Sequence, residues 1–148
     1  MKTIERRSAF TLIEVLIVVV IMAILAATII PQFTDSTKDA KASTVKFNLA
    51  TLRSQIQLYR TQHNGLNPSA TLVELTKATD ATGAQGTGAT FVYGPYLREI
   101  PFNPFSNSKT VTTTTEDPIT TVPAGTGGWI YNATTGNIWI DHATYYTF

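Results

Sequence analysis

The stretch FTLIEVLIVVVIMAILAATII, Phe10–Ile30, decides the organisation of the chain, because it is nearly continuous hydrocarbon over its whole length. As an α-helix with a rise of about 1.5 Å per residue it spans about 31 Å, the thickness of the hydrocarbon core of a bilayer. Glu14 is the only charged residue in the stretch. A charge deep in such a helix costs about 2.5 to 3.5 kcal/mol on insertion scales, so an interaction that offsets this cost is expected.

The residues on either side of the stretch indicate how it crosses a membrane. Lys2, Arg6 and Arg7 precede it against a single Glu5, whereas the segment after Pro31 mixes acidic and basic residues. Positive charges accumulate on the cytoplasmic side of membrane spans. We therefore expect the N-terminus in the cytoplasm and the remainder of the chain outside.

Two ordinary interpretations of the stretch leave Glu14 unexplained. A secretory signal peptide has a shorter apolar core, about 7 to 15 residues, although Leu25-Ala26-Ala27 fits its cleavage site. A plain membrane anchor gives no reason for an acidic residue within the span. The helix dipole favours an anion near the N-terminus by about 0.3 to 1 kcal/mol, which offsets only part of the cost. A cation from another chain would offset more, so Glu14 is predicted to be an assembly residue.

Residues 6–14, with the sequence RRSAFTLIE, resemble the prepilin signature of type IV pilins and of the pseudopilins of type II secretion. The resemblance implies that a prepilin peptidase cuts between Ala9 and Phe10 and methylates the new amine of Phe10. It also implies that Glu14 pairs with the Phe10 amine of a neighbouring subunit when the helices bundle into a filament. Ala9 stands where the family usually has Gly. Because it is also small, we expect processing to be slowed at most.

The chain after Pro31 predicts a second, one-sided helical half and a helix end. From Asp35 to His63, apolar residues recur at steps of four and three, which is typical of a helix with one buried face. Asn64-Gly65 tolerates the left-handed conformation of a C-terminal cap. If Pro31 only kinks the chain, one helix runs from Phe10 to His63. The predicted buried positions are Val45, Leu49, Leu52, Ile56 and Tyr59.

The C-terminal part predicts a small sheet that covers this helix. Residues 128–131 (GWIY) and 137–141 (NIWID) flank the turn 132–136 (NATTG), which is typical of a β-hairpin. We expect a short helix over Ser69–Lys77, a solvated loop over Lys109–Thr126, and docking of Tyr93–Phe105 on the helix. Residues 94–97 of that segment, GPYL, are similar to a passage of the major secretion pseudopilin. The aromatic residues expected to pack back on the sheet are Tyr145, Tyr146 and Phe148.

The resulting fold class is α+β, a pilin-like lollipop in which a long N-terminal helix packs on a small C-terminal antiparallel β-sheet. The resemblance implies that residues 1–9 form a basic leader peptide, residues 10–30 the transmembrane and filament-core helix, and residues 31–148 a periplasmic globular domain.

Composition and residue spacing argue against catalysis, metals and nucleic acid. The net charge is +1 with 14% charged residues and no cysteine, so neither a polyanion-binding surface nor thiol chemistry is expected. His63 and His142 lack neighbours at metal-ligand spacing. Ser106, Asp141 and His142 have no motif that supports a catalytic triad. The chain is therefore predicted not to be an enzyme.

Calcium is the one cofactor that the resemblance raises. The major secretion pseudopilin has a calcium site in its C-terminal loop, built around a Gly-x-Asp-Gly turn with further acids. Here Thr134-Thr135-Gly136 supplies no carboxylate at the turn, and Asp141 is the only local acid. We therefore expect no cofactor, with Asp141 as the single candidate calcium ligand.

The predicted function is a structural subunit of a type II secretion pseudopilus, which polymerises through its N-terminal helix to drive protein export across the outer membrane. Expected partners are further copies of the chain, the prepilin peptidase, the inner-membrane assembly platform and its ATPase, minor pseudopilins and the membrane, but no nucleic acid. The precursor is expected in the inner membrane with its C-terminal domain in the periplasm. One alternative is a type IV pilus subunit for adhesion, motility or DNA uptake. Another is a membrane-anchored binding or enzymatic domain.

Overall fold

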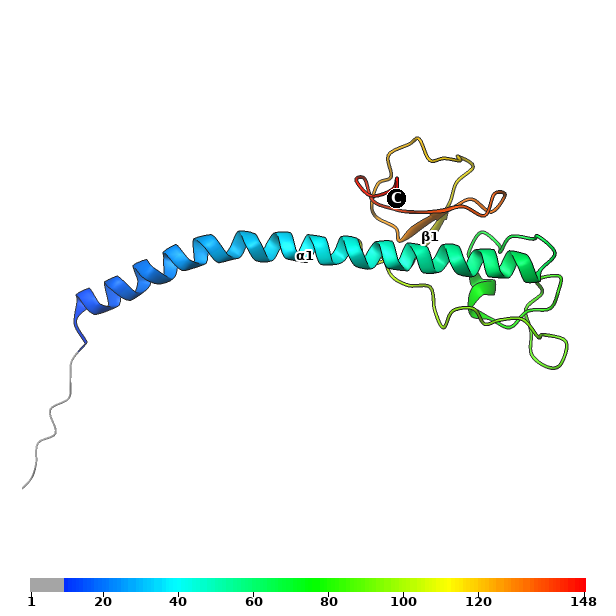
Figure 1. The fold of residues 1–148 in the computed structure, drawn as a ribbon, viewed down its shortest axis with the longest axis horizontal. Helices are drawn as coiled ribbons and strands as arrows, with labels where there is room; N and C mark the ends of the chain where they lie inside the picture. Colours follow the sequence, from blue (N-terminus) through cyan, green and yellow to red (C-terminus); the bar gives the residue numbers. More distant parts are fainter. Residues whose placement is uncertain (1–9) are drawn as a thin grey trace, which may run out of the picture. The chain divides into compact units, whose positions relative to one another are not determined.

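The computed structural model describes residues 10–148, which divide into two compact units that meet between Asp39 and Ala40. The predicted leader, including Ala9, lies outside the described residues. One helix, α1 (Leu12–Gln62), contributes to both units (Figure 1). Pro31 lies inside α1, so the prediction that the helix continues past this proline is confirmed.

In the first unit, α1 has no covering layer. Every residue from Phe10 to Lys41 is exposed in the isolated chain, including the large apolar side chains. Among the described residues, α1 is the helix long and apolar enough to cross a membrane, by its length and composition. A helix that is apolar on all sides and buried by nothing in its own chain requires lipid or other chains around it.

In the second unit, α1 is one-sided, as the spacing predicts. Its buried residues are Val45, Leu49, Leu52, Ile56 and Tyr59, each at most 2% exposed. The helix ends where Asn64-Gly65 predicts it: both residues have positive φ, and the Gly65 amide donates to the Arg60 carbonyl at 2.8 Å. The predicted one-sided helix is therefore confirmed, with its last residue at Gln62.

The segment after α1 packs on the same buried face. The short helix expected over residues 69–77 is a single 3₁₀ turn, η1 (Val73–Thr76). The amides of Tyr96 and Leu97 both donate to the Leu75 carbonyl, at 2.9 and 2.8 Å. The predicted docking of residues 93–105 is confirmed, because members of this segment pack against the core; they are Tyr96, Leu97, Ile100 and Phe105.

The sheet has three strands in the order β1-β2-β3: β1 (Val111–Thr113), β2 (Trp129–Tyr131) and β3 (Ile138–Ile140). The predicted hairpin is confirmed, since β2 and β3 pair antiparallel with Trp129 opposite Ile140. However, β1 pairs parallel with β2, so the sheet is mixed rather than antiparallel. The segment expected to be a solvated loop therefore contains a strand. Its sequence, VTT, has too few apolar residues to show the alternation of a strand.

The core lies between the sheet and the second half of α1. Trp129 and Tyr131 are fully buried, and their polar atoms have partners: Trp129 Nε1 donates to the Pro101 carbonyl at 2.7 Å and the Tyr131 hydroxyl to the Pro68 carbonyl at 3.1 Å. Trp139, on the opposite face of the hairpin, is also buried at 8% exposure. The two sides of the hairpin are thus both covered.

Of the three C-terminal aromatic residues expected to pack back, two do so, Tyr145 and Phe148. Arg53 of α1 donates to the main-chain oxygen of Phe148 at 2.6 Å and to the Ile138 carbonyl at 3.2 Å. Lys46 lies 4.0 Å from the centre of the Phe148 ring, a cation–π contact.

The buried face of α1 provides a stability prediction. Ile56→Ala leaves a cavity in a fully buried position and is expected to lower the free energy of unfolding by about 2 to 5 kcal/mol. Leu58→Ala, two residues along the same helix at a 43% exposed position, is the control and is expected to cost much less. Urea unfolding of the full chain in detergent micelles measures both changes, and equal losses would contradict the assigned helix face.

Candidate functional site

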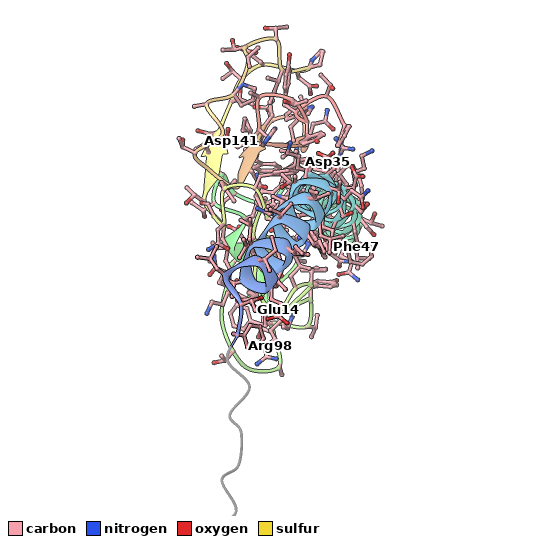
Figure 2. All side chains as sticks on the ribbon, turned by 90° about the vertical axis from the view of Figure 1, so that its left-hand side faces the viewer. Glu14, Asp35, Phe47, Arg98 and Asp141 are labelled. Carbon is pink, nitrogen blue, oxygen red and sulfur yellow. The ribbon has the colours of Figure 1, made fainter. Side chains whose placement is uncertain are left out.

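Glu14 forms a capping box with Thr11 at the start of α1. The Thr11 amide and hydroxyl both donate to Glu14 Oε2, at 2.9 and 2.8 Å. In return the Glu14 amide donates to the Thr11 hydroxyl oxygen at 3.3 Å. The helix begins at Leu12, so Thr11 is the N-cap residue and Glu14 the third residue of the helix, the reciprocal arrangement of this motif. Figure 2 labels Glu14 near the exposed start of the helix.

The cap identifies a partner for Glu14 that the sequence interpretation missed. The signal was present, because Thr11-Leu12-Ile13-Glu14 fits the pattern of a Ser or Thr followed three residues later by an acid. The cap satisfies donors at the helix start and places an anion where the helix dipole favours it. It does not neutralise the charge. Within the described residues the ion pairs are Lys38–Asp35 and Lys109–Glu99, so a cation for Glu14 has to come from elsewhere.

Asp141, the candidate calcium ligand, follows β3 and is buried at 5% exposure; Figure 2 labels it beside the strands. Its carboxylate accepts two backbone hydrogen bonds: the Gly125 amide donates to Oδ1 at 2.8 Å and the Gly127 amide to Oδ2 at 2.5 Å. No group of three or more His, Cys, Asp or Glu residues is placed to hold a metal ion within residues 10–148. The donor set around Asp141 is therefore made of N–H groups rather than the oxygen ligands of calcium.

The turn between β2 and β3 is held by an amide side chain. Asn132 Oδ1 accepts hydrogen bonds from the amides of Thr134 and Thr135, at 2.9 and 3.2 Å. Asn132 Nδ2 donates to the Glu116 carbonyl at 3.3 Å, which links the turn to the loop after β1. The β2–β3 turn, which lacks the carboxylate of the family's calcium turn, is thus closed by the Asn132 side chain.

Glu116 organises the loop after β1 in the same manner as Asp141 organises its own. Its Oε2 accepts from the amides of Thr120 and Thr121, at 2.7 and 3.0 Å, and its Oε1 accepts from the Thr121 hydroxyl at 2.6 Å. Hydrogen bonds from Thr121 and then from Thr120 lower the pKa of the Glu116 carboxyl from 4.5 to about 2. The loop is therefore held by an ionised acid.

The two histidines and the serine discussed above as possible metal ligands or catalytic residues have structural roles in the fold. His63 is fully buried, stacks on Tyr59 at 3.8 Å between ring centres, and has its Nε2 2.9 Å from the Thr79 hydroxyl. His142 packs against Phe105 at 4.5 Å. The Ser106 hydroxyl donates to the Gly127 carbonyl at 2.6 Å, so it is engaged by backbone rather than by a base.

Comparison with known proteins agrees with this geometry at the N-terminus. The family model described as the prokaryotic N-terminal methylation motif matches residues 5–30, which include the capping box and the exposed apolar half of α1. The chain thus carries a prepilin-type N-terminal methylation motif, which confirms the resemblance stated from the sequence.

The relatives to which the chain is similar share one name. The chain is similar to type II secretion system core protein G of Pseudomonas aeruginosa, at 29% identity over 70% of this chain and 71% of the relative. It is also similar to the proteins of that name from Klebsiella pneumoniae and Aeromonas hydrophila, both at 26% identity, over 70% of this chain and over 72% and 71% of those relatives. No solved structure matches.

The Glu116 loop generates a pH prediction. Because folding lowers the pKa of Glu116 below 4.5, its contribution to stability is complete above pH 4.5 and is lost as the pH falls towards 2. Glu116→Gln is therefore expected to lower the thermal midpoint near neutral pH, and the difference from the natural chain is expected to shrink between pH 4.5 and 2. Circular dichroism in detergent micelles measures this difference, with Asp39→Asn as an exposed control. A difference that stays constant through this range would contradict the assigned role.

Proposed function

We propose that the chain is a structural subunit of a type II secretion pseudopilus, which polymerises through α1 to drive protein export across the outer membrane. The proposal is supported by the similarity to relatives named type II secretion system core protein G and by the methylation motif over residues 5–30. Before assembly the chain is a single-pass inner-membrane protein with its N-terminus in the cytoplasm and residues 31–148 in the periplasm. This orientation follows from the excess of basic residues before the span.

The observation that carries the proposal is the capped acid in an otherwise apolar, exposed helix. Both Thr11 donors go to Glu14 Oε2, and Oε1 accepts no hydrogen bond within the described residues. A carboxylate has about four lone-pair sites, so Glu14 can keep its cap and still accept a cation at Oε1. On cleavage after Ala9, the new amine of Phe10 on a neighbouring subunit supplies that cation. Phe10 is 81% exposed and therefore accessible to a partner.

The remaining partners follow from this role. A prepilin peptidase processes the leader, an inner-membrane platform with an ATPase moves subunits out of the membrane, and minor pseudopilins join the filament. The polymer has the chain's own copies as its main partners. The proposed role is structural, without an enzymatic activity.

N-terminal processing is the first test. In cells that contain a prepilin peptidase, the mature chain is expected to begin at N-methylated Phe10, as measured by mass spectrometry of the purified protein. Cells with an inactivated peptidase serve as the control and are expected to retain residues 1–9. An intact leader in peptidase-positive cells, or a chain beginning near Thr28, would refute the pilin-like interpretation; the second result would indicate a signal peptide.

Glu14 is the second test. Glu14→Gln retains an acceptor oxygen for the Thr11 cap but removes the negative charge, so filaments are expected to fall at least tenfold while membrane insertion is retained. Thr28→Val is a matched control, because it also removes a polar group from the span; the Thr28 hydroxyl bonds only the Leu25 carbonyl of its own helix, at 2.9 Å. Electron microscopy of sheared filaments and alkaline membrane extraction give the two measurements. Normal filaments from Glu14→Gln would refute the charge pairing.

A deletion strain separates the pseudopilus from the pilus. Loss of the chain is expected to abolish export of proteins that use the type II pathway and to leave surface pili and twitching motility unchanged. Loss of motility or DNA uptake with normal export would favour the type IV pilus instead.

A further inference from the structure

We infer that Glu116 and Asp141 hold the C-terminal loops through backbone N–H hydrogen bonds, and that these bonds replace the calcium ion that the pilin-like resemblance implies. The fold of the second unit is then independent of calcium. The inference concerns stability of the folded chain and does not rest on the proposed filament function.

Asp141 is surrounded by donors that disfavour a cation. The Gly125 and Gly127 amides direct their partially positive hydrogens at its two carboxylate oxygens. Gly127 has to be glycine for this approach, because a Cβ at this position would lie 2.6 Å from Oδ2. Calcium takes six to eight oxygen ligands at about 2.3 to 2.6 Å, whereas the groups that face the two carboxylate oxygens of Asp141 are backbone N–H donors. A calcium ion that displaced either amide would leave a buried N–H group without a partner, which is unfavourable.

The carbonyl groups beside Asp141 are also engaged. Asn103 is fully buried, and its Nδ2 donates to the carbonyls of Gly128 and Asp141, both at 3.2 Å. Its Oδ1 accepts from the Phe105 amide at 3.0 Å. An ionised aspartate in place of Asn103 could not donate to these carbonyls, so the two contacts require the amide side chain. The carbonyl oxygens of Gly128 and Asp141 therefore each already have an amide donor within the chain.

Glu116 holds the neighbouring loop through backbone N–H groups in the same way. Glu116 binds the amides of Thr120 and Thr121 with its carboxylate, and its carbonyl accepts from Asn132 of the β2–β3 turn. Asn137, just after that turn, donates to Asp117 Oδ2 at 2.8 Å. The loop after β1 and the β2–β3 turn are thus joined by direct hydrogen bonds between protein groups, in the region where the resemblance implies a metal.

Calcium dependence of the thermal midpoint tests the inference. The full chain in detergent micelles is expected to unfold at the same temperature in millimolar calcium chloride and in millimolar EDTA. Asp141→Asn exchanges one acceptor oxygen for a donor that faces an N–H group, so its midpoint is expected to fall by about 5 °C or more, equally in both buffers. Asp39→Asn, an exposed acid on α1, is the control and is expected to leave the midpoint unchanged in both.

Each outcome of the experiment decides the inference. A clear rise of the midpoint with calcium in the natural chain would overturn it and establish a metal site. An Asp141→Asn midpoint equal to that of the natural chain would also overturn it, because the carboxylate would then hold nothing. If Asp141→Asn does not fold, Gly127→Ala provides the second variant: its Cβ displaces Oδ2, and a lowered midpoint in both buffers is expected. An unchanged midpoint in Gly127→Ala would contradict the close N–H contact.

Discussion

The constraint on which the rest of the structure depends is that α1 carries more apolar surface than its own chain covers. From Phe10 to Ile30 the side chains are apolar on every side of the helix and exposed, whereas from Val45 to Tyr59 they form one stripe that is buried. The sheet and the segment after α1 cover only this stripe. One helix therefore combines a half whose buried face is covered by its own chain with an apolar half that its own chain leaves uncovered. The uncovered half requires an environment of lipid or of other copies.

The sequence predicted those features that depend on repeated patterns. The stripe recurs at steps of three and four, and the hairpin has two β-rich runs around a glycine-containing turn, so both were found in advance. The strand β1 was missed because Val111-Thr112-Thr113 acquires its structure from pairing with Trp129–Tyr131, which lies far along the chain. The carboxylate-bound loops were missed for a similar reason: nothing local to Asp141 indicates that Gly125 and Gly127 point their amides at it. At the N-terminus the local signal is present, because Thr11-Leu12-Ile13-Glu14 fits the pattern of a capping box.

Glu14, Glu116 and Asp141 stabilise their local segments in the same way. Glu14, Glu116 and Asp141 each accept backbone N–H groups that would otherwise lack partners, at a helix start in the first case and in loops in the other two. A charged acceptor makes stronger hydrogen bonds than a neutral one, so each acid stabilises a local segment that has little apolar surface of its own. The difference lies in the second oxygen. Asp141 uses both oxygens within the chain, as does Glu116, whereas Glu14 Oε1 accepts no hydrogen bond within residues 10–148.

The Oε1 atom of Glu14, free within the described residues, bears on what favours transfer of the subunit from the membrane into the proposed filament. Lipid tails are as apolar as leucine, so moving the apolar half of α1 from lipid into a bundle of identical helices gains little from the hydrophobic effect. The gain has to come from close packing and from polar pairing that lipid does not offer. The cap with Thr11 is present in both environments and therefore cancels. The proposed pairing of Oε1 with the Phe10 amine would exist only between chains, so it would contribute a difference between the stored and assembled states, and it would align neighbouring helices by their N-terminal residues.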